Sequence, residues 1–399
     1  MEKKEQKKWL KFRHKLTVWL LRPIFTLVVC LRYHVKIEKF KEQGDRPYLI
    51  VINHQTAFDQ FFVSIMFNRP VYFIASEDIF SLGWASDAIR YIAAPIPIKK
   101  QTLDLQAVKN CIKVAREGGT IALAPEGNRT YHGRTLYMKP GIASLVKKLG
   151  LPLAFFRIDG GYGTHPRWSD VVRGGKMRCY ISRVIEPEEY ANMTGDELFS
   201  IIQQELWADE GRVTGNFPHK KNAEFLERAM YVCPYCGLST FESHGDTITC
   251  KTCGRTIRHN ADKTLSGIGF TFPHLFVADW YDAQSDFINQ LDLSALTESP
   301  VWEETAQLRL VIPYKHKKLL NKAAKVALYG DRITVDDRVF HFDDTSAVVV
   351  LGRNKLNIYA DKELFQLKGS KRFNALKYVQ FFHRYQNIKG GKNDEFLGL

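Results

Sequence analysis

Between Pro47 and about Glu186, short apolar runs rich in β-branched residues alternate with segments of helical spacing. The strands expected from this pattern are 48–52, 71–75, 120–124 and 151–158, and the helices are 57–67, 106–117, 142–149, 195–208 and 223–230. Strands without polar interruptions are buried on both faces, and strands that alternate with helices form largely parallel sheets. This part of the chain therefore predicts an α/β domain, which the last two helices close.

The pattern changes in the last quarter of the chain. After a helix expected at 278–284, six short apolar runs from about Val311 onward are separated by Gly-Asp, Asp-Asp and Gly-Arg-Asn turn signals. A final helix places its aromatic residues on one face at i, i+3, i+4 and i+7, and these are Tyr378, Phe381, Phe382 and Tyr385. The pattern predicts a small antiparallel β domain with a terminal helix.

The N-terminus combines a basic segment with an apolar one. Residues 1–15 hold seven Lys or Arg and two Glu, and the apolar run 16–31 follows directly. Arg22 and Pro23 divide this run into pieces shorter than the roughly 18 to 20 apolar residues that a spanning helix needs. We expect a helix, kinked at Pro23, that lies in the membrane interface with Trp19 at that depth, and no signal peptide. The alternative is a pair of helices that cover the core.

Composition and charge narrow the class of protein. A length of 399 residues predicts two or three domains, and 45% hydrophobic with 25% charged residues is typical of globular chains. The formal net charge of +14 predicts attraction to a polyanion, either nucleic acid or an anionic membrane. The basic N-terminal cluster before an apolar run favours the membrane, on its cytoplasmic face.

The first candidate for chemistry is the turn after the first expected strand. Ligands of open α/β sheets bind at the carboxyl ends of strands, where Asn53 and His54 stand. Asp59 follows five residues later, and the two side chains can converge only if His54 precedes the helix, with Thr56 as its N-cap. We expect a His54–Asp59 pair. The alternative is that Thr56 and Asp59 form only a capping box beside an unrelated histidine.

A second candidate follows another strand end, in the segment 124–130. The guanidinium of Arg129 matches a phosphate bidentately, and Gly127 allows backbone amides to approach the same anion. These residues predict a site for a phosphate-bearing substrate. A polar turn with a surface pair between Glu126 and Arg129 would explain the segment without function.

Taken together, Asn53-His54-x4-Asp59 and Pro125-Glu126-Gly127-Asn128-Arg129-Thr130, about 70 residues apart, resemble the 1-acyl-glycerol-3-phosphate acyltransferase (PlsC-like) family. The segments 94–100, 139–143 and 151–156 resemble further motifs of that family, in the same order. Asn128 stands where the family has Thr, and Ala124 stands where it has an aromatic residue. The motifs therefore indicate the reaction of the family but not the exact molecule that accepts the acyl group. The stretch 160–168 is a further departure, which we expect to be a structural loop and not a lining of the site.

The resemblance implies a mechanism. His54 removes a proton from the acceptor hydroxyl as that oxygen attacks an acyl thioester, and Asp59 orients and stabilises the imidazole. The acceptor implied is 1-acyl-glycerol-3-phosphate (lysophosphatidate), which becomes phosphatidate, and the donor is carried on coenzyme A or acyl carrier protein. The substrate-binding residues expected are Glu126, Gly127, Asn128, Arg129, Thr130, Lys99 and Lys100. Another lysophospholipid or glycerol phosphate is the alternative acceptor.

Four of the seven cysteines form a separate cluster. Cys233 and Cys236, then Cys250 and Cys253, give the spacing C-x2-C-x13-C-x2-C, which is typical of a closed structural Zn²⁺ site. An odd cysteine count without a signal peptide favours a reducing compartment. The arrangement resembles a zinc ribbon, and the last β domain resembles a pleckstrin-homology-like module in element order alone.

The sequence thus predicts five segments: a membrane-associated helical segment (1–40), an acyltransferase domain (41–228), a zinc-ribbon-like module (229–260), a helical and aromatic connector (261–308) and a small β domain (309–399). A basic, ribbon-bearing nucleic-acid-binding protein is the alternative from another class. It would leave the His/Asp and Arg129 motifs without a role, so we expect membrane lipids as partners and not nucleic acid.

Overall fold

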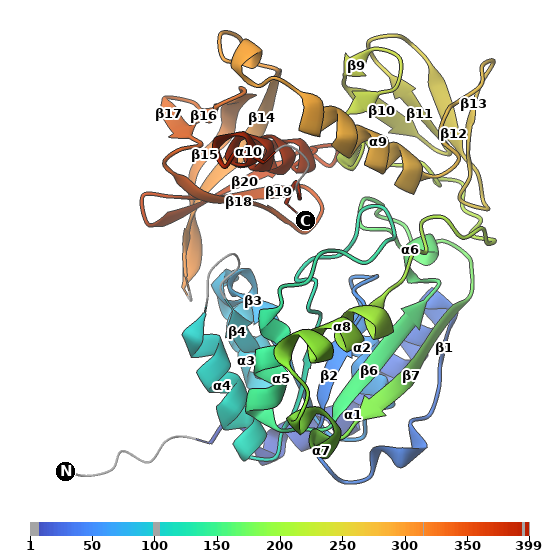
Figure 1. Ribbon diagram of the computed structural model, residues 1–399, viewed down its shortest axis with the longest axis vertical. Helices are drawn as coiled ribbons and strands as arrows, with labels where there is room; N and C mark the ends of the chain where they lie inside the picture. Colours follow the sequence, from blue (N-terminus) through green and yellow to red (C-terminus); the bar gives the residue numbers. More distant parts are fainter. Residues whose placement is uncertain (1–7, 99–103, 314, 393–395, 399) are drawn as a thin grey trace. The chain divides into compact units, whose positions relative to one another are not determined.

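The computed structural model describes residues 8–98, 104–313, 315–392 and 396–398, which form two compact units (Figure 1). Unit 1 comprises Met1–Thr130, Arg134–Thr164 and Gly174–Glu210, and unit 2 comprises Tyr131–Gly133, His165–Arg173 and Gly211–Leu399. Two short segments from within the expected acyltransferase domain thus belong to unit 2. The finer division into five segments stays a prediction.

Unit 1 is built on a seven-stranded sheet in the order β1-β7-β6-β2-β5-β3-β4. Its strands are β1 (Val35–Ile37), β2 (Leu49–Ile52), β3 (Val71–Ser76), β4 (Ile96–Ile98), β5 (Thr120–Leu123), β6 (Leu153–Asp159) and β7 (Met177–Ile185). The pairs from β6 to β4 are parallel, and β7 runs antiparallel to β6. The carboxyl ends of β2, β5 and β6 therefore lie at one edge of the sheet, which is where the candidate motifs follow in sequence.

The helices of unit 1 connect these strands. They are α1 (Phe12–Tyr33), α2 (Asp59–Met66), α3 (Trp84–Ile92), α4 (Leu105–Arg116), α5 (Gly141–Leu149), α6 (Gly161–Thr164), α7 (Pro187–Ala191) and α8 (Gly195–Leu206), with 3₁₀ turns η1 (Lys41–Gln43) and η2 (Glu77–Ser81). Local chemistry sets several of their ends. The Asp104 side chain accepts from two backbone amides at the start of α4, and Thr194 with Glu197 forms a capping box at the start of α8.

Unit 2 combines small sheets, a helix and a large antiparallel sheet. Its elements are η3 (Leu226–Arg228), β8 (Val232–Cys233), β9 (Gly237–Leu238), β10 (Phe241–His244), β11 (Thr247–Cys250), β12 (Thr256–His259), β13 (Leu265–Gly267), α9 (Val277–Gln290) and η4 (Ser294–Leu296), then β14 (Trp302–Ile312), β15 (His316–Leu328), β16 (Arg332–Val335), β17 (Arg338–His341), β18 (Thr345–Leu351), β19 (Lys355–Ala360), β20 (Glu363–Gly369) and α10 (Leu376–Lys389). The last seven strands form one antiparallel sheet in the order β17-β16-β15-β14-β20-β19-β18.

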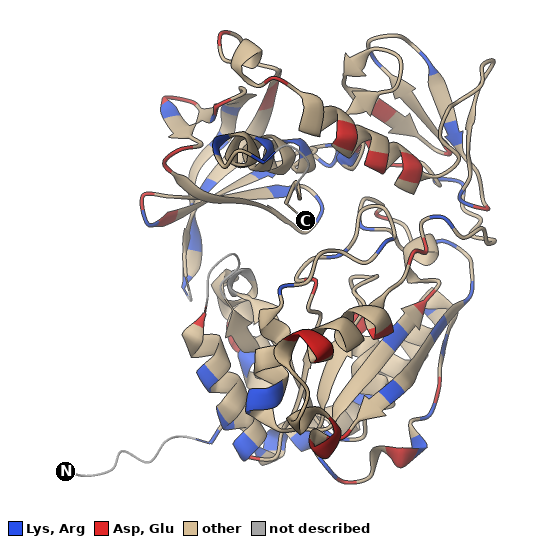
Figure 2. Cartoon of the chain, viewed as in Figure 1, with Lys and Arg blue, Asp and Glu red and all other residues tan. Residues whose placement is uncertain are grey.

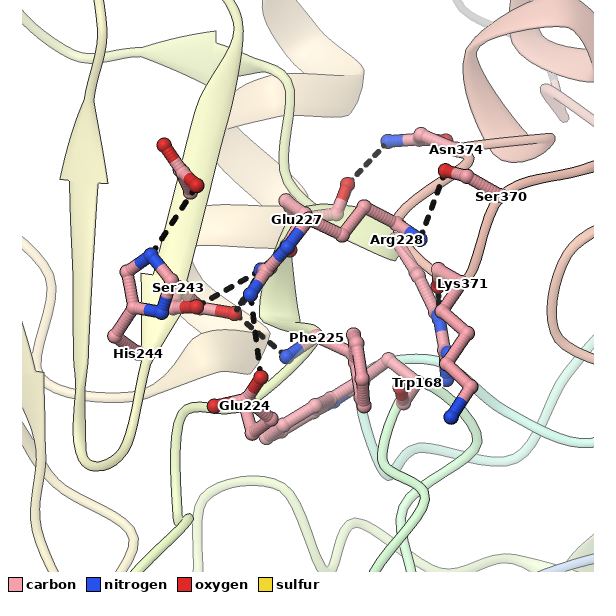
Figure 3. A network of polar contacts seen from close by, with 12 residues as sticks. Trp168, Glu224, Phe225, Glu227, Arg228, Ser243, His244, Ser370, Lys371 and Asn374 are labelled. Carbon is pink, nitrogen blue, oxygen red and sulfur yellow. Dashed lines mark hydrogen bonds and ion pairs between the residues drawn. The ribbon is translucent and has the colours of Figure 1, made fainter.

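One hydrophobic core runs through unit 2 and includes Cys250 of the small sheet, Leu308 of the large sheet, Trp280 of α9 and Phe381 of α10. A buried polar network adds to this core (Figure 3). The guanidinium of Arg372 donates to the Ser243 carbonyl of β10 at 2.8 Å and also contacts the buried Glu227, while the Asn374 amide donates to the Glu227 carbonyl at 2.9 Å. Because these groups come from η3, β10 and the segment before α10, the ribbon-like part and the C-terminal sheet share one interior.

The structure confirms the expected α/β alternation and the C-terminal antiparallel domain, and it corrects several elements. The helix expected at 223–230 is wrong, because that segment contains only η3 and lies in unit 2. The expected helix 57–67 begins later, at Asp59, and ends at Met66. The expected β domain begins earlier, since β14 starts at Trp302. At the N-terminus α1 is a single helix that continues through Pro23, so the two-helix alternative is wrong.

Candidate active site

The turn that joins β2 to α2 carries His54 and is held by its neighbours in the sheet. The fully buried Asn53 side chain accepts from the Ile158 amide at 2.8 Å and donates to the Ile158 carbonyl at 2.9 Å. Both amide atoms of Asn53 are therefore paired with the backbone of β6. This pairing anchors the chain directly before His54, where the strand ends.

His54 and Asp59 form the pair that the sequence predicts. His54 Nδ1 lies 2.8 Å from Asp59 Oδ2, with 27% of the histidine side chain exposed and 4% of the aspartate side chain. Asp59 is the first residue of α2, and Phe58 is its N-cap. His54 thus precedes the helix by five residues, in non-helical backbone, and this is why the two side chains can meet.

The Asp59 carboxylate also organises the turn itself. It accepts from the Gln55 amide at 2.9 Å, from the Thr56 amide at 2.9 Å and from the Thr56 hydroxyl at 2.7 Å. The N-cap of α2 is Phe58, so the expected capping box with Thr56 as the N-cap is wrong. An ionised carboxylate only accepts hydrogen bonds, so Nδ1 of His54 is the donor and Nε2 of the neutral ring carries the lone pair. Nε2 is the atom that can take a proton.

Glu126 lies inside the protein and holds the turn that carries His54 from the side of β5. Its carboxylate accepts from the His54 amide and from the Leu136 amide, both at 2.8 Å, and the residue is 6% exposed. Burial raises the pKa of Glu126 to about 8, against the opposing effect of the two backbone amides. Because Glu126 is buried, the alternative of a surface pair between Glu126 and Arg129 is wrong. The two hydrogen bonds suit Glu126 to position the backbone of His54, in addition to the substrate-binding role expected from the sequence.

The other residues of the second motif surround Glu126. Gly127 is exposed with a φ of +67°, Asn128 and Arg129 are half-buried, and Thr130 is fully buried. Burial raises the pKa of the Tyr33 phenol to about 12, and among nearby charges Arg129 lowers this pKa while Asp59 raises it.

The sequence also predicts that Lys99 and Lys100 bind substrate. Both residues lie outside the described part of the chain.

An apolar cavity of about 660 Å³ opens beside the His54–Asp59 pair. This volume is within the range of roughly 300 to 1,000 Å³ that ligand pockets occupy. His54 and Asp59 line it together with apolar side chains from α1, α2, β3 and α3, among them Val18, Leu21, Phe25, Phe61, Phe73 and Ile89. Apart from His54 and Asp59, the sequence does not predict these lining residues, because they come from elements that lie far apart in the chain and include β2, η2 and β5.

The four clustered cysteines of unit 2 also converge. Their Sγ atoms all lie within 4.8 Å of one another, with 3.8 Å between Cys233 and Cys253 and 3.6 Å between Cys236 and Cys250. In a tetrahedral zinc site with Zn–S bonds of about 2.3 Å, the sulfur atoms lie roughly 3.8 Å apart. The donor set and its dimensions thus fit the Zn²⁺ site that the spacing predicts.

A family model described as Acyltransferase matches residues 32–158. This range contains the His54–Asp59 pair and the segment 124–130. A 1-acyl-sn-glycerol-3-phosphate acyltransferase of Brassica napus, chloroplastic, is 25% identical over 169 residues, 41% of this chain and 47% of that protein. An enzyme of the same name from Pseudomonas aeruginosa is 26% identical over 209 residues, 51% of this chain and 74% of the relative.

Among solved structures, the PlsC 1-acyl-sn-glycerophosphate acyltransferase of Thermotoga maritima is 22% identical, with a TM-score of 0.42, over 49% of this chain and 80% of that one. The chain spans about half the length of the first plant relative. The resemblance to the PlsC-like acyltransferases is confirmed for the part of the chain that carries the two motifs. The cysteine cluster and the C-terminal sheet lie outside the matched family range.

Proposed function

We propose that this protein transfers a fatty acyl group from an acyl thioester to the free hydroxyl of 1-acyl-glycerol-3-phosphate, which gives phosphatidate and a free thiol. The observation that carries the proposal is the hydrogen-bonded His54–Asp59 pair at the wall of the apolar cavity. A base at the wall of an acyl-sized apolar pocket suits the attack of a hydroxyl on a lipid thioester.

The chemistry needs one proton to move twice. His54 Nε2 takes the proton of the acceptor hydroxyl as its oxygen bonds to the thioester carbonyl carbon. The carbon–sulfur bond then breaks and the proton passes to the leaving sulfur. Asp59, already hydrogen-bonded to Nδ1, stabilises the positive ring between these two transfers. No covalent acyl-enzyme is required.

The remaining parts of the site have separate tasks. The acyl chain of the donor occupies the cavity, whose wall is formed by α1, α2, β3 and α3. Arg129 binds the acceptor phosphate, and Gly127, Asn128 and Thr130 shape its loop. Glu126 fixes the backbone of His54.

Association with a membrane follows from α1. Of the helices in the described ranges, α1 alone is long and apolar enough to cross a membrane. Its outer side presents large apolar side chains, with exposed fractions of 73% for Trp19, 59% for Ile24 and 63% for Leu27. We infer that this face of α1 enters the membrane interface from the cytoplasmic side, where lipid acceptors are found.

In unit 2, Cys233, Cys236, Cys250 and Cys253 hold a structural Zn²⁺ ion. Because protein fills all four positions, the ion takes no part in acyl transfer. Beside this site, α9 carries the acidic residues Asp279, Asp282 and Asp286 (Figure 2), of which the first two form ion pairs with Arg212.

The decisive test is acyl transfer by the purified protein with acyl-coenzyme A or acyl-acyl carrier protein and each of lysophosphatidate, glycerol 3-phosphate and a panel of lysophospholipids. Product lipids are identified by mass spectrometry. We expect phosphatidate from lysophosphatidate, and a loss of about 10² to 10⁴ in rate for His54→Ala. Equal rates for the wild type and the variant would refute the role of His54, and a better acceptor in the panel would replace lysophosphatidate.

A further inference from the structure

The stretch after β6 has no role in the mechanism above, yet it packs directly on the catalytic turn. The strand ends at Asp159, Gly160 follows it, and Gly161 begins α6. A Cβ atom on Gly161 would lie 2.6 Å from Gln55 Cβ, closer than real Cβ contacts allow, and 3.3 Å from Thr56 Cγ2, which is a tight contact. Glycine at this position is therefore required for α6 to support the backbone between His54 and Asp59.

Gln55 shows why this packing matters. Its side chain is fully buried and, within the described structure, the side-chain amide group makes no hydrogen bond. The backbone amide of Gln55, in contrast, donates a hydrogen bond to Asp59. The side chain next to His54 is thus placed by van der Waals contact with α6, which is sensitive to shifts of a few tenths of an ångström.

Glu210 holds α6 in place. One carboxylate oxygen of Glu210 accepts from the Gly160 amide at 2.5 Å, and the other accepts from the Tyr162 amide at 3.0 Å. Hydrogen bonds from backbone amides to an ionised carboxylate are stronger than those between neutral groups. The two bonds fix the turn on both sides of Gly161.

A path of hydrogen bonds also leads from the Glu210 segment to the other side of His54. Ala208 and Thr135 form two hydrogen bonds. The Thr135 amide donates to the Ala208 carbonyl at 2.9 Å, and the Ala208 amide donates to the Thr135 hydroxyl at 2.8 Å. The next residue, Leu136, donates to Glu126, which accepts from the His54 amide. The segment that carries Glu210 thereby braces the catalytic turn from two directions.

We propose that Glu210 is a positioning residue of acyl transfer, which acts through α6 and Gly161 on the turn between His54 and Asp59. The proposal rests on the proposed function of that pair. Glu210 touches neither substrate nor the reacting atoms. Its task is to keep His54 Nε2 within reach of the acceptor hydroxyl, since displacements of about 1 Å in an active site cost up to about 10² in rate.

The kinetic test compares Glu210→Ala and Glu210→Gln with Glu188→Ala, which removes an exposed glutamate of α7 in the same unit. For Glu210→Ala we expect kcat to fall by about tenfold to a hundredfold, with the KM for the acyl donor within about twofold. Glu210→Gln keeps one acceptor oxygen and should recover part of the loss. A kcat of Glu210→Ala equal to that of Glu188→Ala, or an equal loss in both Glu210 variants, would overturn the proposal.

A second readout does not depend on the reaction. Hydrogen exchange of the amides of His54, Gln55 and Thr56, all bonded to carboxylates, should accelerate in Glu210→Ala and in Gly161→Ala. Gly195→Ala is the control for the second variant, because a Cβ there meets no atom within 4 Å. Unchanged exchange in this segment would refute the inference, even if kcat fell.

The two readouts separate the two claims. A wild-type protein without acyl transfer activity, in which exchange nevertheless rises in both variants, would refute the proposed function and support the bracing of the turn by Glu210. Activity in the wild type with no response in either readout would refute the role of Glu210 alone.

Discussion

Asp59 combines two tasks in one side chain, because the carboxylate that receives His54 Nδ1 also receives the amides of Gln55 and Thr56. The same group therefore holds both the ring of His54 and the turn that carries it. This explains how a short turn without regular structure can hold the histidine in one orientation, as its proposed role as a base requires.

Asp59→Asn tests this combination. An amide offers one acceptor oxygen in place of two, so its NH₂ group must face either His54 or the backbone amides, and one partner is lost. We expect kcat to fall by about 10² to 10⁴ at saturating acyl donor. Asp87→Asn, at an exposed position of α3, is the control, and its kcat should match the wild type. A fully active Asp59→Asn protein would contradict the proposed base.

We expect Glu126 to make the stability of unit 1 depend on pH. Burial raises its pKa from 4.5 to about 8, so between these values the folded state holds a proton that the unfolded state has released. The free energy of unfolding should therefore fall as pH rises through this interval, by at most about 1.4 kcal/mol per pH unit from this group.

Urea unfolding of wild type and Glu126→Gln between pH 5 and 9 measures the effect. The variant has no proton to release, so we expect the difference in unfolding free energy between the two proteins to change with pH up to about pH 8 and to level off above it. A constant difference over the whole range would show that Glu126 is ionised in the folded state at all these values.

At the scale of elements, α1 serves two environments. Its inner side lines the cavity through Val18, Leu21 and Phe25, and its outer side exposes large apolar residues such as Trp19 and Leu27. In the proposed function, this helix lies between the membrane interface and the cavity. The two sides can be altered separately, which allows separate tests of binding and of catalysis.

The outer side is tested with Trp19→Asn and Leu27→Asn together. Both residues are exposed, so we expect the fold to be retained and binding to vesicles of phosphatidylglycerol and phosphatidylcholine to fall by about tenfold or more, since each buried apolar side chain contributes about 1.5 to 3 kcal/mol. Cosedimentation measures binding. Unaltered binding would place the membrane contact elsewhere.

The inner side is tested at α3, where Ala88 lines the cavity and Ala85 does not. Ala88→Leu reduces the space for the acyl chain, so kcat/KM should shift toward shorter acyl donors, with about three- to fourfold lost for each methylene that no longer fits. Ala85→Leu should keep the wild-type profile across a series of acyl-coenzyme A lengths. The same profile in all three proteins would exclude this cavity as the acyl site.

At the scale of the whole molecule, unit 2 joins segments that are far apart in sequence. Tyr131 and Trp168, from within the matched acyltransferase region and just after it, belong to the same core as Cys233, Cys250 and the strands of the C-terminal sheet. The unit therefore has one continuous interior, and a metal bound at the cysteines would stabilise all of it.

We expect about one zinc ion per chain by elemental analysis, and chelation or Cys236→Ser should lower the unfolding temperature of unit 2 by several degrees. Hydrogen exchange in β14 and β20 should rise along with that in β11, because they share one core. Cys30→Ser, outside the cluster, is the control. Exchange that rises in the ribbon strands alone would show that the C-terminal sheet is stable without the metal.

Much of unit 1 could be predicted from the sequence because its elements are local. Continuous apolar runs predicted β2, β3, β5 and β6, and helical spacing predicted α4, α5 and α8. Where local cues were weak, the prediction failed. The run at 223–230 has helical composition, but contacts within unit 2 hold it as a 3₁₀ turn.

His54, Asp59, Arg129 and the cysteines were evident from residue type and spacing, since bases, phosphate ligands and metal ligands draw on few side chains. The sequence alone therefore determined which residues are candidates for chemistry and which of them follow strand ends. Only the tertiary structure decided that Glu126 turns inward to hold His54, that Glu210 braces α6, and that elements from distant parts of the chain enclose the cavity. These features depend on contacts between residues far apart in the chain, which no local pattern of hydrophobic and polar positions records.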